Sequence, residues 1–193
     1  MFARKSTLAF LLAISLFLSG CATIDKISAP SLKGDSSTSS VVVVKCEATW
    51  RGVLGIKESQ QVVSGVLLST DGTRRINGQG VADLIIFSDV SPGEYNLARV
   101  QTTRQVGNMI FQQTYNIPGE NVLDYVFSVK AGEPKYIGVV TVEEIQKLTE
   151  RRVIFGLKPS KEAETAAWEK FTNLYQGSSW ANEVQKRISE LKR

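Results

Sequence analysis

Short runs rich in Val, Ile, Phe and Tyr alternate with turn residues between positions 41 and 157. Runs of this length, bounded by Gly, Pro, Asn or Asp, are typical of antiparallel strands. The run 125–129 is apolar at nearly every position, which predicts a central strand buried on both faces. The full pattern predicts strands over 41–50, 61–69, 73–76, 84–88, 95–100, 109–116, 125–129, 136–142 and 151–157.

The spacing of apolar residues becomes helical in the segment 158–193. Ser160 is the predicted N-cap of a first helix, Gly177 ends that helix, and a second helix begins near Ser179. The result is a predicted helical hairpin, whose apolar side must pack on the strand domain or on a partner. Further upstream, the charged segment 143–150 predicts a short helix between two strands.

The first twenty residues have the layout of a secretory signal: Arg4 and Lys5, then the eleven-residue, largely apolar run 8–18, then small residues. A helix needs roughly 20 residues to cross the hydrocarbon core, so this run predicts a signal peptide and not a permanent span. We therefore assign 1–20 to the signal. The following serine-rich stretch, 21–40, predicts a flexible linker.

The tetrapeptide Leu18-Ser19-Gly20-Cys21 resembles the bacterial lipobox, in which a signal peptidase cuts before a cysteine whose thiol carries diacylglycerol. The resemblance implies lipidation of Cys21, and two or three acyl chains anchor a protein firmly in a membrane. In many Gram-negative bacteria, Asp after the cysteine retains a lipoprotein in the inner membrane. Ala22 stands there, so the resemblance favours the outer membrane. The alternative is an ordinary signal peptide with an accidental cysteine.

Composition narrows the chemistry of the mature chain. Once Cys21 is alkylated, Cys46 has no partner for a disulfide and is predicted to be a small buried hydrophobe. The absence of histidine removes the commonest metal ligand and the usual general base, so neither a metal nor a cofactor is predicted. The net charge of +4 includes two cations of the signal, and the remainder is too small to predict nucleic-acid binding.

The segment 89–97 reads Asp-Val-Ser-Pro-Gly-Glu-Tyr-Asn-Leu after an apolar strand. Ser91 to Glu94 suits a type II turn with Pro second and Gly third. This corner resembles a repeated feature of carboxypeptidase-regulatory and transthyretin-like domains, and the resemblance covers residues 41–142. It implies that 41–157 forms an antiparallel β-sandwich, to which 158–193 adds the helical hairpin. Such a fold carries no function by itself.

Candidate chemical groups are few. Gly78-x-Gly80 lacks a third glycine and predicts a loop with positive φ. The pairs Arg74-Arg75 and Arg151-Arg152 can meet anionic glycans or lipid headgroups. Most carboxylates fall at predicted strand ends or turns, where a charged side chain is expected to be solvated. These carboxylates are Asp71, Asp83, Asp89, Glu94, Asp124, Glu143 and Glu144.

Trp168, Tyr175 and Trp180 of the tail form either a partner-binding surface or a small core under the helices. Taken together, the sequence predicts a lipid-anchored accessory protein of the cell envelope, not an enzyme, that recognises an envelope protein or glycan. One alternative is an envelope hydrolase that uses two convergent carboxylates. Another is a structural lipoprotein that spaces or braces the envelope.

Overall fold

The computed structural model describes residues 31–118 and 126–193. Over these residues the chain is mainly β with two C-terminal helices, as predicted. The strands are β1 Ser40–Arg51, β2 Lys57–Ser69, β3 Arg75–Val81, β4 Leu84–Val90, β5 Gly93–Val106, β6 Met109–Asn116, β7 Val126–Val129, β8 Lys135–Gln146 and β9 Arg151–Lys158. The helices are α2 Lys161–Leu174 and α3 Ala181–Leu191.

Four strands close into a ring. The first half of β1 pairs with β4 and its second half with β2, while β3 pairs with both β2 and β4. Strands β5, β6 and β7 extend the sheet beyond β2, and β8 and β9 extend it beyond β1. The described strands thus belong to one hydrogen-bonded sheet, which does not show the two separate sheets of the predicted sandwich. Nor is the pairing purely antiparallel, because β8 runs parallel to β1.

Two glycines of β3 allow the ring to close. A Cβ on Gly78 would lie 2.6 Å from the ring of Phe87, and one on Gly80 would lie 2.4 Å from the carbonyl oxygen of Val62. Both glycines are strand residues outside the positive-φ region, so the predicted loop at Gly78-x-Gly80 is wrong. Their function is close approach of neighbouring groups, for which a strand uses glycine.

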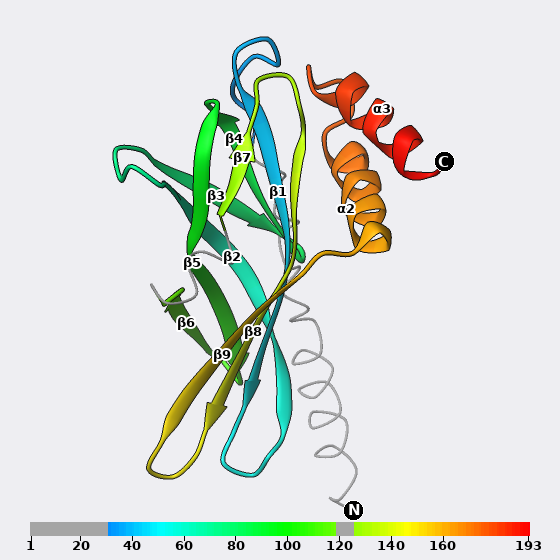
Figure 1. The fold of residues 1–193 in the computed structure, drawn as a ribbon. Coiled ribbons are helices and arrows are strands. Elements are labelled where there is room, and N and C mark those ends of the chain that lie inside the picture. The colour runs from blue at the N-terminus through cyan, green and yellow to red at the C-terminus, as the bar shows by residue number, and fades with distance from the viewer. Residues whose placement is uncertain (1–30, 119–125) are drawn as a thin grey trace, which may run out of the picture.

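Strand β1 separates two hydrophobic cores. Alternate side chains of a strand point to opposite faces, so Val42 and Val44 enter the main core while Val41 and Val43 face the helices. All four valines are fully buried. Figure 1 shows α2 and α3 packed beside the first half of β1. The uninterrupted valine run is therefore explained by burial on both faces.

The helical hairpin forms as predicted. Ser160 is the N-cap of α2, with extended backbone angles, and its Oγ accepts a hydrogen bond from the Ala163 amide at 3.1 Å. Gly177 follows the helix with φ of 80°, a conformation that favours glycine. In α3, Val184 and Ile188 form the buried side.

Two predicted elements differ in the structure. The segment 143–150 is not a helix, because β8 continues to Gln146 and the Lys147 amide donates to the Glu150 carbonyl in a hairpin turn. The run 125–129 is not a central strand. Its described part, β7, pairs only with β5 among the described residues, and Ser128 is exposed. Tyr125 lies outside the described residues.

The corner between β4 and β5 is held by a tyrosine. The buried Tyr95 hydroxyl donates to the Ser91 carbonyl at 3.0 Å, an arrangement known as a tyrosine corner in β domains. Arg74 donates to the Tyr95 hydroxyl and to the Pro92 carbonyl, both at 3.2 Å. Gly93 has φ of 153°, far from the roughly +80° of a type II turn, so that turn type is not formed.

Part of the predicted linker lies against the domain. Ser39 and Ser40 are buried, and the Ser40 hydroxyl donates to the Glu133 carbonyl at 2.6 Å. Leu32 packs against the core under the helices. The folded part therefore begins before Val41, whereas 1–20 and 21–30 lie outside the described residues. No helix of the described ranges has the length and apolar character needed to cross a membrane.

Candidate functional site

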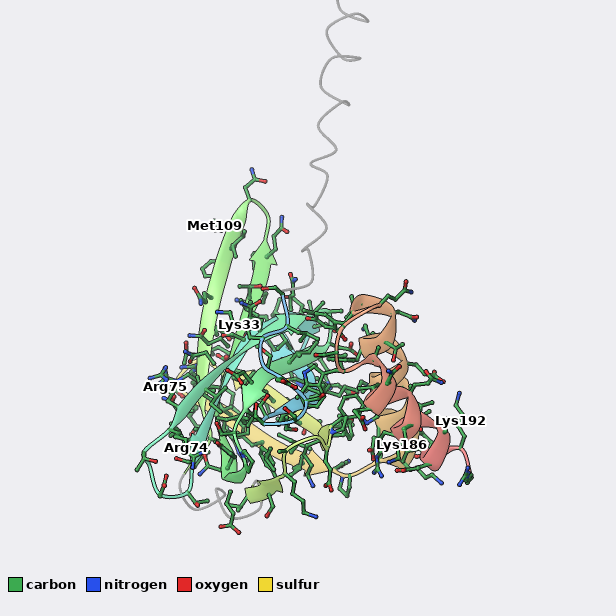
Figure 2. The ribbon with its side chains drawn as sticks, turned by 90° about the horizontal axis from the view of Figure 1, so that it is seen from above. Lys33, Arg74, Arg75, Met109, Lys186 and Lys192 are labelled. Atoms are coloured by element: carbon green, nitrogen blue, oxygen red, sulfur yellow. The ribbon has the colours of Figure 1, made fainter. Side chains whose placement is uncertain are left out.

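A polar groove of about 790 Å³ lies between residues 31–33 and strands β3 and β4. We call it the β3–β4 groove. Its polar side chains comprise two cations, two amides, two hydroxyls and one carboxylate, contributed by Lys33, Arg75, Asn77, Gln79, Ser31, Ser88 and Asp89. In Figure 2, Lys33 lies on the same flank of the molecule as Arg75, away from Lys186 of α3 and from Lys192, which follows that helix.

The strand period positions one wall of this groove. Arg75, Asn77 and Gln79 occupy alternate positions of β3, so their exposed side chains leave the same face of the strand. Gln79 pairs with Ile86 of β4, which brings the end of that strand into the groove. The opposite wall, residues 31–33, is held by the packing of Leu32 under the helices.

The charge of the groove favours an anionic or strongly polar ligand. Neither Lys33 nor Arg75 has an ion-pair partner among the described residues, and Asp89 is the single carboxylate of the lining. Arg and Lys recognise phosphate and carboxylate by charge-assisted hydrogen bonds, which amide groups can supplement. One carboxylate cannot supply the acid and base pair of glycoside hydrolysis, so this arrangement is suited to binding.

All four arginines of the two basic pairs are exposed, but in each pair one arginine donates hydrogen bonds to a neighbouring group and the other forms no ion pair with any described residue. Arg74 is engaged at the tyrosine corner, and Arg151 donates to the Glu144 carboxylate at 2.9 Å. Arg75 and Arg152 are exposed and form no ion pair with any other described residue. The dipeptides alone gave no signal as to which member of each pair donates these hydrogen bonds.

A buried polar network lies where β2, β5, β6 and β8 meet. Glu144 is only 2% exposed and accepts hydrogen bonds from Arg151 and, at 2.7 Å, from the Tyr115 hydroxyl. Burial, followed by the hydrogen bond to Glu144, raises the pKa of Tyr115 to about 12. The Thr102 hydroxyl donates to Gln60 beside them. Because Glu144, Tyr115, Thr102 and Gln60 are buried and only Arg151 is exposed, we assign the network to stability.

Of the remaining carboxylates singled out from the sequence, Asp71, Asp83 and Glu143 form contacts at three separate places. Asp71 accepts hydrogen bonds from Ser69 and Thr73 within its own turn, which lowers its pKa to about 2. Glu94 lies on β5. Asp83 forms an ion pair with Lys170 of α2, and Glu143 forms one with Arg51 of β1. Asp124 lies outside the described residues.

One pocket, of about 420 Å³, does bring carboxylates together, at α3. Glu133, Glu183 and Glu190 line it, but three cations line it as well, namely Lys135, Lys186 and Arg187. Arg187 forms an ion pair with Glu190 at 3.6 Å. The opposite charges balance within this pocket, and none of the carboxylates singled out from the sequence contributes to it.

The three aromatic residues proposed for partner binding are packed inside. Trp168 and Trp180 are fully buried and Tyr175 is 8% exposed, all in the core between the helices and β1. Trp168 also donates its indole N–H to Glu164 at 3.3 Å. Their burial agrees with the second of the two interpretations, a small core under the helices, because side chains in this position present no surface to a partner.

Exposed apolar side chains gather at hairpin tips. In the β1–β2 loop, Val53, Leu54 and Ile56 are 51%, 86% and 60% exposed, and Leu148 of the β8–β9 loop is 86% exposed. A further group, Met109 and Ile110, lies at the tip of the β5–β6 hairpin. Sequence reasoning missed these tips, although an apolar Val-Leu-Gly-Ile run between Arg51 and Lys57 was a visible signal.

Comparisons with known proteins add little. No family model matches the chain, and no curated protein matches it. Among solved structures it is similar to a leucine-rich repeat protein from Bacteroides thetaiotaomicron, at 10% identity and a TM-score of 0.38, over 71% of this chain and 16% of that one. A likeness at this level carries no argument about fold or function. Cys21 lies outside the described residues, so the proposed lipid site rests on sequence.

Proposed function

We propose that this chain is a lipid-anchored binding protein of the bacterial outer membrane, without enzymatic activity, that recognises an anionic envelope glycan in the β3–β4 groove. The observation that carries the proposal is the placement of Lys33 and Arg75, without ion-pair partners among the described residues, beside Asn77 and Gln79. The signal segment and the lipobox tetrapeptide support the anchor.

The groove and the proposed anchor are close along the chain. From Cys21 to Ser31 the chain advances ten residues, which span at most ~35 Å when fully extended. Ser31 and Lys33 are themselves part of the groove wall. A ligand in the groove would therefore be held near the membrane surface, and the lipid would raise the local concentration of the protein around envelope glycans.

The resemblance to carboxypeptidase-regulatory and transthyretin-like domains remains part of the proposal. The corner of segment 89–97 joins β4 to β5 and Tyr95 is its central buried residue, which supports this part of the proposal. In this chain the ring closure through Gly78 and Gly80 would be a departure from that family of sandwiches.

Glycan recognition is tested by titrating the unlipidated chain, beginning at Ala22, with acidic and neutral oligosaccharides of equal length. The acidic ones should bind, and the double substitution Lys33→Ala, Arg75→Ala should weaken binding by at least about a hundredfold, because two charged hydrogen bonds are lost and each contributes about 1.5–3 kcal/mol. Isothermal titration calorimetry measures both affinities.

Arg152→Ala is the matched control, since it removes another exposed arginine without an ion-pair partner among the described residues. It should leave the affinity within about twofold of the unsubstituted protein. Equal affinity for neutral oligosaccharides, or a double variant that binds as well as the control, would refute the proposed site.

A further inference from the structure

Two apolar hairpin tips lie side by side. We define the hairpin end as residues 52–56, between β1 and β2, together with 147–150, between β8 and β9. Because β1 and β8 are paired in parallel, with Arg51 opposite Ile145, their following loops leave the sheet together. Figure 1 shows both loops at the same end of the molecule.

Apolar side chains of these loops are strongly exposed to solvent. Leu54 and Leu148 are each 86% exposed, far beyond what packing on their own domain requires. Gly55 has φ of 76° and open space around it, so the backbone reverses there without covering its neighbours. Exposed leucines can insert into the headgroup layer of a lipid bilayer, where their apolar side chains are buried.

Basic residues lie in or next to both loops of the hairpin end. Arg51 and Lys57 flank the first loop, Arg151 and Arg152 follow the second, and Lys147 lies within the second. Three of the five form ion pairs, Arg51 with Glu143, Arg151 with Glu144 and Lys147 with Glu150, while Lys57 and Arg152 are exposed without an ion-pair partner among the described residues. Basic residues next to an inserting apolar group are attracted to anionic lipid headgroups.

We infer that the hairpin end docks on a lipid bilayer, with Leu54 and Leu148 inserted among the headgroups and Lys57 and Arg152 at the anionic surface. Such docking would orient the domain on the membrane. The inference rests on the proposed anchor only for proximity, because a chain of ten residues from Cys21 keeps Ser31 within ~35 Å of the lipid.

The test uses the chain beginning at Ala22, which carries no lipid, and vesicles of phosphatidylethanolamine and phosphatidylglycerol in a sedimentation assay. The unsubstituted protein should sediment with these vesicles. The double substitution Leu54→Ser, Leu148→Ser should weaken partitioning by at least about tenfold, because two apolar side chains lose their burial in lipid. Both sites are exposed, so the melting temperature should not change.

Ile110→Ser is the control, since Ile110 is 73% exposed on the separate β5–β6 hairpin. It should sediment like the unsubstituted protein. Sedimentation that is absent, or equal in the double variant, would overturn the inference. So would a dimer, found by analytical ultracentrifugation, that the double substitution abolishes, because a second copy would then occupy the hairpin end. None of these failures bears on glycan titration or on lipid at Cys21.

Discussion

Cys46 lies on the face of β1 that points into the main core, and only 2% of its surface is exposed. Burial raises the pKa of its thiol to about 12, so the reactive thiolate is scarce at neutral pH. In the chain beginning at Ala22, we expect less than about a tenth of this thiol to react with Ellman's reagent in the time that suffices in denaturant. Rapid stoichiometric reaction of the native protein would contradict this placement.

Gly78 offers a second prediction at the level of one residue. Its Cβ position is occupied by the ring of Phe87, which is fully buried and cannot move away. Gly78→Ala should lower the free energy of unfolding by about 2–3 kcal/mol through overpacking, measured by urea denaturation.

Gly55→Ala is the comparison for this prediction, because that site has open space and a positive φ. It should cost about 1 kcal/mol from backbone strain alone. If Gly78→Ala proved no more costly than Gly55→Ala, the close approach of β3 and β4 would not be the reason for the glycine.

At the level of elements, strands and helices were predictable where the apolar pattern is decided locally. The helix α2 is an example, since Ser160 and the spacing of its buried residues act within one segment. The pattern gave a wrong prediction where contacts with other strands determine the type of an element or its place in the sheet. Charged residues 143–150 suggested a helix, but Glu144 is satisfied by Tyr115 and Arg151 of other strands. The apolar composition of the run 125–129 suggested a central strand, but composition does not show how many partners a strand has. Among the described residues, β7 pairs with β5 alone.

The helical hairpin should contribute strongly to stability. Trp168 is fully buried between α2 and β1, so Trp168→Ala should lower the free energy of unfolding by about 3–5 kcal/mol. Leu148→Ala removes an exposed apolar group as a control and should change it by less than about 0.5 kcal/mol. Urea denaturation compares the two variants. An unchanged stability of the Trp168 variant would return this residue to the role of a partner-binding side chain.

At the level of the whole molecule, the ring of four strands and the β3–β4 groove depend on contacts that no local pattern reveals. Lys33 comes from a segment predicted to be a linker, and Arg75 from a strand predicted to end at Ile76. Only the packing of Leu32 and the close approach allowed by Gly78 bring these groups together. The pair Arg74-Arg75 was visible in the sequence. Only the fold shows that Arg74 lies at the tyrosine corner and Arg75 in the groove.

We propose that lipid on Cys21 holds this protein on a membrane. Mass spectrometry of the mature N-terminal peptide tests it directly, with Cys21→Ser as the control for membrane fractionation. We expect a peptide that begins at Cys21 and carries a diacylglycerol thioether, and we expect Cys21→Ser to prevent both the cleavage before this position and the lipid. A mature protein that begins elsewhere, or a Cys21 without lipid, would contradict the account.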